Sequence, residues 1–297
     1  MNKNAANKII RAYLKERFNF FVIKKRLSDF AFTFNIFGDG RDYIIKLIEK
    51  KNVVSNIIHD KKHVNKVVSA ILSLKDNNIL SVNIIDYYLS KEYSIVLLEK
   101  EKLSKIKGVK KEDFKIISRA ILGFHSACKN ISFKLLPWDN FPQHFKEALK
   151  NNNRLDLVNS FIRESAKYID RKNLVSCHND IHAGNIYYSK EKVIFLDLDD
   201  MCKSSYFNDL GMLLANFMDS SYSNTDLFEA ISNILKGYNL KMSKNNILNI
   251  SIFSLRKLYF TEAYFLYVNK KNAQLPRFVY EIRRREKIII NFMESYL

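Results

Sequence analysis

An apolar strand that ends abruptly in acidic residues constrains this chain more than any other feature. Residues 193–196 read Val-Ile-Phe-Leu, and carboxylates follow at Asp197, Asp199 and Asp200. A short run of branched and aromatic residues is typical of a buried strand. Buried carboxylates need hydrogen-bond or charged partners, so we expect the end of this strand to be a polar site.

A polar loop precedes this strand. Residues 176–185 read Ser-Cys-His-Asn-Asp-Ile-His-Ala-Gly-Asn and lead into a short apolar strand, so the two strands would form a hairpin. Asp180 lies five residues before Asn185, so one loop can offer a carboxylate to an attacking hydroxyl and an amide oxygen to a metal. Mg²⁺ prefers oxygen ligands and takes only one or two protein carboxylates. This pattern predicts phosphoryl transfer, with Asn185 and Asp197 as metal ligands.

The order of His178, Asp180, Asn185 and Asp197 resembles the catalytic loop and metal-binding segment of the aminoglycoside phosphotransferase and choline kinase-like superfamily. These small-molecule kinases share the protein-kinase architecture. Residues 208–211, Asn-Asp-Leu-Gly, resemble the Asp-Leu pair that opens the family's next helix. The resemblance implies an enzyme that transfers a phosphoryl group to an alcohol.

The resemblance also implies an α+β, two-lobe fold: a small antiparallel sheet lobe over residues 1–100 that binds nucleotide, and a larger, mainly helical lobe over 101–297 with the catalytic loop and acceptor site. Hydrophobic periodicity agrees with this division. It predicts a helix over 4–17, strands over 18–23, 30–37 and 43–48, a turn at 38–41, a helix over 53–74, strands over 79–88 and 93–98, and mostly helices from residue 112.

Five residues are predicted to bind the nucleotide. Lys46 lies in an apolar strand and needs an anionic partner; the resemblance implies that it contacts the α- and β-phosphates, although an edge-strand lysine in solvent is the alternative. The phosphate-covering turn lacks glycine, which eases close backbone approach, so Ser28 is expected to help there. The helix after the third strand lacks a glutamate to pair with Lys46, and Asp60 is the candidate partner. Glu99 and Glu101 lie in the connector whose backbone the resemblance assigns to the adenine edge.

The remaining site residues support the loop. The resemblance makes Asp180 the group that orients the acceptor hydroxyl and accepts its proton. His178 is expected to brace the loop by hydrogen bonds, and Asp209 to anchor it through backbone amides. Asp199 or Asp200 would orient the loop or meet an amine of the acceptor.

The distribution of charge limits the kinds of partner that the chain is expected to bind. The net charge is +18, with +14 in residues 1–150 and +4 in the rest, but residues 177–229 carry −6. A basic surface around an acidic island suits a site that gathers Mg²⁺ while attracting nucleotide. The basic residues are scattered, unlike a nucleic-acid binder, and no run is apolar enough to cross a membrane. Three cysteines without metal spacing fit a reducing cytoplasm, and we expect a monomer or a homodimer.

The predicted reaction is ATP-dependent, with GTP as the alternative, and its acceptor is a small amine-bearing molecule, either an amino alcohol or an aminoglycoside or other antibiotic. Aromatic side chains between residues 259 and 267 could surround an ammonium by cation–π contact, or they could belong to the core. Two alternatives stay open. The segment 197–200 also resembles a stress-response protein kinase of the superfamily, and the missing glycines and glutamate would suit a non-catalytic nucleotide binder.

Overall fold

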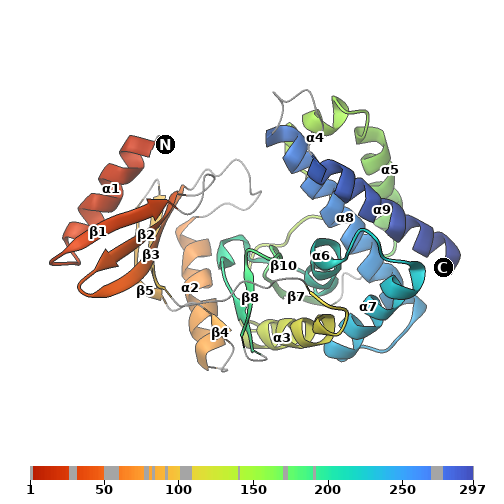
Figure 1. The fold of residues 1–297 in the computed structure, drawn as a ribbon, viewed down its shortest axis with the longest axis horizontal. Helices are drawn as coiled ribbons and strands as arrows, with labels where there is room; N and C mark the ends of the chain where they lie inside the picture. Colours follow the sequence, from red (N-terminus) through yellow and green to blue (C-terminus); the bar gives the residue numbers. More distant parts are fainter. Residues whose placement is uncertain are drawn as a thin grey trace.

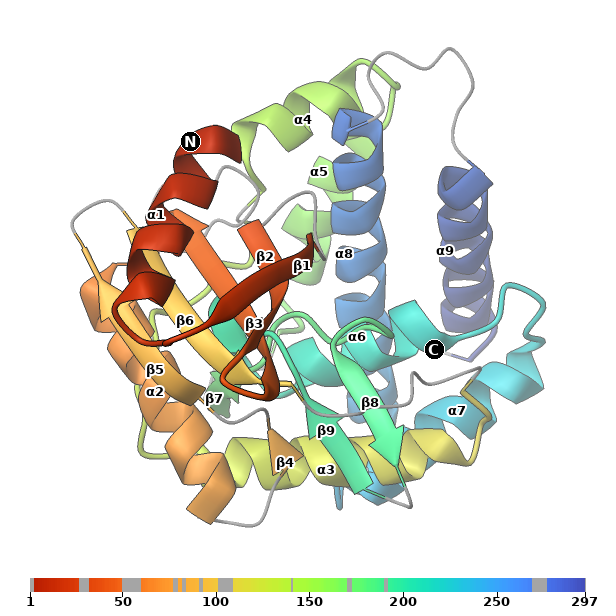
Figure 2. The ribbon, with the colours of Figure 1, turned by 60° about the vertical axis from the view of Figure 1, so that its left-hand side comes forward.

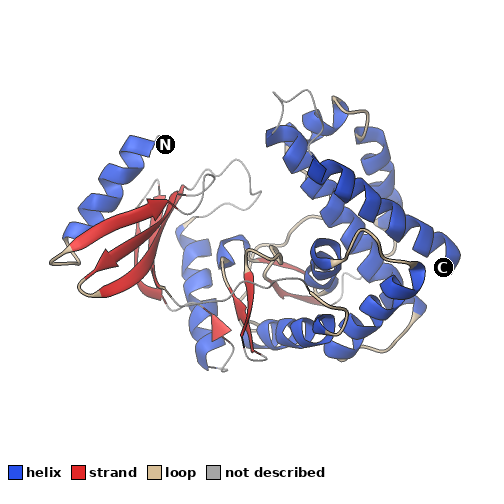
Figure 3. Cartoon of the chain, in the orientation of Figure 1, coloured by secondary structure: helices blue, strands red, loops and turns tan. Residues whose placement is uncertain are grey.

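The computed structural model describes residues 3–26, 32–49, 60–76, 80–81, 84–90, 93–100, 109–139, 141–169, 173–189, 192–268 and 277–296. An antiparallel sheet lies towards the N-terminal side, and helices make up most of the remainder (Figure 1; Figure 3). Within this part of the chain, no helix is long and apolar enough to cross a membrane.

The N-terminal sheet has the strand order β1-β2-β3-β6-β5, and all its neighbours are antiparallel. Buried and half-buried positions alternate along β2, as expected for a strand with one face on a core. Asp39 and Gly40 both have positive φ angles, 42° and 84°, in the tight turn that joins β2 to β3. The strand bounds are Phe21–Arg26 (β1), Phe32–Gly38 (β2), Arg41–Glu49 (β3), Ile84–Leu89 (β5) and Tyr93–Glu99 (β6).

Helix α1 (Lys3–Lys15) covers one face of this sheet (Figure 2). Ile10 and Leu14 are fully buried and pack with Ile36 and Ile45 of the sheet in a core of its own. The predicted helix over 4–17 therefore corresponds to α1. Its apolar stripe is what holds it on the strands.

Helix α2 (Lys61–Asp76) packs with the C-terminal part of the molecule. Its buried residues Val67, Ala70, Ile71 and Leu74 belong to the same hydrophobic core as the helices that follow. Residues 53–59 of the predicted helix lie outside the described residues. The lobe boundary at residue 100 stays a prediction, because α2 precedes that boundary in sequence but shares the later core.

The predicted strand over 79–88 is divided. β4 (Leu80–Ser81) pairs in parallel with β9 (Lys192–Phe195), whereas β5 pairs with β6. The predicted hairpin is present, because β8 (Ile186–Ser189) pairs antiparallel with β9. One segment before the connector therefore contributes to two sheets, and periodicity within the segment could not show this.

Two helices form the centre of the helical part. α6 (Phe207–Phe217) packs along α8 (Lys244–Val268), and Ser254 of α8 donates a hydrogen bond to the carbonyl of Gly211. The other elements surround them: α3 (Asp113–Ala127), α4 (Gln143–Lys150), α5 (Leu155–Ser165), the antiparallel strands β7 (Leu174–Cys177) and β10 (Cys202–Ser205), α7 (Asn224–Gly237) and α9 (Arg277–Tyr296).

Gly211 is expected to be irreplaceable for packing. A Cβ atom at this position would lie 2.5 Å from the Cβ of Phe253 and 2.7 Å from its carbonyl carbon. We predict that Gly211→Ala lowers the free energy of unfolding by about 1 to 3 kcal/mol, because the two helix backbones must move apart. Urea denaturation measures this. Leu72→Ala, at a residue that is 57% exposed, is the control and should change stability by less than about 0.5 kcal/mol; equal effects would contradict the packing argument.

Candidate active site

The loop after β7 is held by the first turn of α6. Asp209 is fully buried, and its Oδ2 accepts a hydrogen bond from the backbone N–H of His178 at 2.8 Å while its Oδ1 accepts from that of Asn179 at 2.9 Å. Asn179 has a left-handed φ of 66°, so both amides can turn towards one carboxylate. Further along α6, Asn216 donates to the carbonyl of Ile181 at 2.6 Å. Helix α6 therefore fixes the loop at several points.

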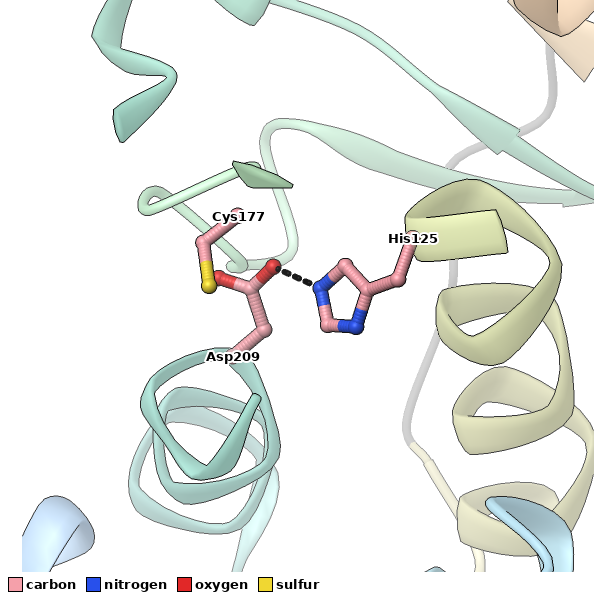
Figure 4. A group of neighbouring side chains, drawn as sticks. All are labelled: His125, Cys177 and Asp209. Atoms are coloured by element: carbon pink, nitrogen blue, oxygen red, sulfur yellow. Dashed lines mark hydrogen bonds and ion pairs between the residues drawn. The ribbon is translucent and has the colours of Figure 1, made fainter. Parts of the chain in front are cut away.

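A hydrogen bond from His125 of α3 holds Asp209 in place (Figure 4). The Nε2 of His125 donates to Asp209 at 2.9 Å, and the hydroxyl of Tyr238 donates to Nδ1 of the same ring at 2.6 Å. Burial by itself would raise the pKa of Asp209, but His125 and His178 outweigh burial and lower it. The carboxylate is therefore ionised and fully engaged.

Cys177 completes a buried group of possible metal ligands with His125 and Asp209 (Figure 4). Its thiol donates to the carbonyl of Ser205 at 3.4 Å, and burial raises its pKa well above the ordinary value. A protonated thiol is a poor ligand, and the oxygens of Asp209 already accept three hydrogen bonds. This cluster anchors the loop.

His178 braces the loop against the hairpin. Its ring is fully buried, its Nε2 donates to the carbonyl of Leu196 at 2.8 Å, and its Nδ1 accepts from the backbone N–H of Asp180 at 3.3 Å. Leu196 in turn donates its own N–H to the carbonyl of Asn185 at 2.8 Å. These bonds connect both ends of the loop to the end of β9.

Asp180 and Asn185 contact each other directly, and Asp197 follows Leu196, whose N–H donates to the carbonyl of Asn185. The amide Nδ2 of Asn185 donates to the carboxylate of Asp180 at 2.7 Å and to its backbone carbonyl at 3.1 Å, so its Oδ1 is left to accept a cation. Asp197 directly follows Leu196 in a left-handed conformation, with φ 57°. The three predicted residues thus come from two connected segments, as the motif required.

Lys46, on β3 of the N-terminal sheet, contacts two carboxylates of the segment after β9. Its ammonium forms ion pairs with Asp197 and with Asp199, and its side chain is only 12% exposed. Burial alone would lower the pKa of Lys46, but the two carboxylates outweigh burial and raise it. Lys46 is therefore a charged, partly buried group, not an edge-strand lysine in solvent.

The prediction that Asp60 pairs with Lys46 is wrong for this structure. Asp60 immediately precedes α2, and its Oδ1 accepts from the backbone N–H of His63 at 2.7 Å, as a helix-capping residue does. The side chain is used locally, and the lysine finds its partners on the segment after β9. Asp199 is one of these partners.

Of the remaining predicted residues, Asp200 ends a short 3₁₀ turn, η1 (Leu198–Asp200), and is half-buried. Glu99 is the last residue of β6 and lies opposite Tyr43 in the sheet. Ser28 and Glu101 lie outside the described residues.

Two further residues beside Asp180 were not foreseen. Lys257 of α8 places its Nζ 3.5 Å from Oδ1 of Asp180, and His182 places its Nε2 3.2 Å from Oδ2. Burial alone would raise the pKa of Asp180, but Lys257 and then His182 outweigh it and hold the pKa well below its ordinary value. His182 belongs to the loop motif and could have been noticed there. Lys257 lies 77 residues away, and no local pattern singles it out.

The aromatic residues of α8 are mostly packed. Tyr259 is 2% exposed and donates its hydroxyl to Glu286 at 3.1 Å, and Phe260 contacts Phe145 edge-on with ring centroids 5.0 Å apart. Tyr264 is half-buried; burial and then the charge of Asp180 raise its pKa. The Nζ of Lys257, which lies beside Asp180, is 5.9 Å from the ring centroid of Phe260, so the cation on this ring is the protein's own lysine.

Comparison with known proteins finds a family model that matches part of the chain. Residues 126–230, which include the loop, Asp197 and Asp209, match the model of the phosphotransferase enzyme family. The structure resembles that of amicoumacin kinase hAmiN in complex with AMP-PNP, Ca²⁺ and Ami, with 13% identity, a TM-score of 0.73 and coverage of 98% of this chain and 96% of that one. The chain has the fold of the aminoglycoside phosphotransferase and choline kinase-like superfamily.

Two further solved structures agree with this fold. The structure of a microcompartment-associated aminopropanol kinase has 11% identity, a TM-score of 0.69 and coverage of 97% and 98%. That of choline kinase LicA from Streptococcus pneumoniae has 16% identity, a TM-score of 0.64 and coverage of 98% and 99%. The predicted resemblance, the α+β kinase-like fold and the phosphotransferase class are confirmed. No curated protein sequence matches the chain.

The charge of Lys257 is expected to set the ionisation of Asp180. We predict that Lys257→Met raises the pKa of Asp180 by roughly one unit, because the nearest cation is removed while His182 remains. Carbon-13 NMR titration of the aspartate carboxyls measures this, with Asp180→Asn to assign the signal. Lys244→Met, at the exposed start of α8, should leave the signal where it is. An unchanged pKa in Lys257→Met would mean that Lys257 does not control Asp180.

Proposed function

We propose that this protein is an O-phosphotransferase that transfers the γ-phosphate of ATP, or alternatively of GTP, to a hydroxyl of a small amine-bearing molecule. The observation that carries the proposal is the carboxylate of Asp180, which is ionised and held by Asn185 at 2.7 Å. An ionised carboxylate at a fixed position can orient a hydroxyl and accept its proton in the transition state. The match to the phosphotransferase family over this same segment supports it.

The donor atoms suit a magnesium ion. Asp197 offers a carboxylate on a side chain that is 43% exposed, and Asn185 has an amide oxygen available once its nitrogen is committed to Asp180. Hard oxygen donors of this kind suit Mg²⁺, which keeps further positions for phosphate oxygens and water. We therefore assign these two residues to Mg²⁺, which would neutralise the charge that develops on the phosphates. Lys46 would contact phosphate oxygens from the sheet.

The charges around Asp180 indicate how the acceptor would be oriented in the site. Lys257 already stands beside Asp180, so the acceptor should approach this carboxylate with its hydroxyl and place its amine elsewhere. The neighbours named for aminopropanol and choline act, by those names, on amine-bearing alcohols. A cytoplasmic location goes with this proposal, because nucleoside triphosphates are available there.

A matched screen tests the acceptor class. ADP release is measured with ATP and Mg²⁺ for amino alcohols, homoserine-like metabolites and aminoglycosides, each beside the alcohol in which a methyl or methylene group replaces the amine. We expect turnover with at least one amine-bearing alcohol and much less with its partner. The variant Asp180→Asn should lose about 100-fold or more in turnover while keeping nucleotide affinity.

The control for this loss is Asp156→Asn, at an exposed residue of α5. It removes the same charge and should keep wild-type turnover. Undiminished turnover in Asp180→Asn would remove Asp180 from the role of base, and equal turnover on both members of every pair would remove the amine from the acceptor.

The metal assignment has its own test. In a thermal shift experiment, ATP with Mg²⁺ should stabilise the wild-type protein more than ATP with EDTA, because a ligand that binds only the folded state raises its stability. We predict that Asp197→Ala abolishes this difference, and that Asp156→Asn retains it. A full response to Mg²⁺ in Asp197→Ala would contradict the assignment.

A further inference from the structure

The carboxylates that hold Lys46 come from an unexpected place. Sequence reasoning sought the partner on the helix after β3, but the described part of that helix contributes none. Both partners, Asp197 and Asp199, belong to the segment that follows β9. Lys46 of the N-terminal sheet is thus held by residues that follow the β8–β9 hairpin of another sheet.

The two carboxylates are not equivalent. Asp197 is 43% exposed and is the residue assigned to Mg²⁺, so a bound metal would compete with Lys46 for its oxygens. Asp199 is 18% exposed and lies in the turn η1, where the buried side chain of Leu198 anchors the backbone. Asp199 can therefore keep its contact with Lys46 when the metal engages Asp197.

Helix α2 supports Asp199 through its backbone. The Nε2 of His63 lies 2.7 Å from the carbonyl oxygen of Asp199 and donates to it. The ring of His63 is 7% exposed and packs edge-on against Phe133, with centroids 5.6 Å apart. Asp60 caps the same helix by accepting from the N–H of His63. The helix thus reaches Lys46 indirectly, through the turn that carries Asp199.

We propose that Asp199 is the residue that positions Lys46 for the nucleotide phosphates, and that His63 holds Asp199 in place. The inference rests on the proposed role of Lys46 in nucleotide binding. A lysine side chain is long and flexible, so a fixed carboxylate that restrains it lowers the entropy lost when the phosphates bind. Asp199 acts through Lys46 and need not touch the nucleotide itself.

A double-mutant cycle tests this dependence. The dissociation constant of a non-hydrolysable ATP analogue is measured by calorimetry at saturating Mg²⁺ for wild type, Lys46→Ala, Asp199→Asn and the double variant. We expect each single change to weaken binding about tenfold, equivalent to about 1.4 kcal/mol. The double variant should bind the analogue no more weakly than the weaker-binding single variant, within a factor of about two, because Asp199 acts only through the lysine.

Two further measurements separate positioning from other roles. Asp199→Glu, which keeps a carboxylate, should retain binding within about threefold, and His63→Ala should weaken binding in wild type but not in Asp199→Asn. The Mg²⁺ concentration at half-saturation, at fixed analogue, should be the same in Asp199→Asn as in wild type. Glu229→Gln, which breaks a partly exposed ion pair with Lys111, is the control and should bind like wild type.

The outcomes that overturn the inference are distinct from those that overturn the function. Effects of Lys46→Ala and Asp199→Asn that multiply to about a hundredfold, or a shifted Mg²⁺ midpoint, would make Asp199 an independent group or a metal ligand. Wild-type binding by Asp199→Asn would also overturn it. If Lys46→Ala itself binds the analogue normally, the proposed role of Lys46 in nucleotide binding fails, whatever Asp199 does.

Discussion

The buried carboxylate of Asp209 is the interaction on which the site depends. An ionised group without solvent must have partners, and here they are His125 and the amides of residues 178 and 179. Because Asp209 lies on α6, which packs along α8 through Gly211, the position of the loop is set by the helical core. Removing one of these partners would leave a buried charge with fewer compensating contacts.

The charges at the site are paired within the protein. Asp180 lies between Lys257 and His182, and Lys46 lies between Asp197 and Asp199. These contacts lower the pKa of Asp180 and raise that of Lys46, and incoming ligands must compete with them. In the proposed reaction, a metal at Asp197 would displace Lys46 from this carboxylate, and an acceptor would share Asp180 with Lys257. The net charge of the chain therefore says less about the site than these four contacts do.

The two sides of the molecule are connected through short elements. The sheet and α1 have their own core, whereas α2 packs with the later helices and β4 pairs with β9 of the β8–β9 hairpin. The ion pairs of Lys46 bring the sheet and the hairpin together. Residues before position 100 therefore contribute to both parts of the structure.

The sequence by itself determined the elements and the local motif. Helical and strand periods marked α1, the strands around Lys46 and the late helices, because burial of one face imposes a repeat that is visible in the residues. The loop from His178 to Asn185 and the strand end at Asp197 could also be predicted, since these residues act within two neighbouring segments.

Only the tertiary structure decided which distant residues meet them. Lys257 of α8 lies beside Asp180, and Asp199 takes the place beside Lys46 that was expected for Asp60. Strand β4 pairs with β9 and not with the N-terminal sheet. These contacts join segments far apart in the chain, and they follow from how helices and sheets pack. A single sequence carries periodicity and spacing, but it does not carry the relative placement of packed elements, which the balance of the whole core sets.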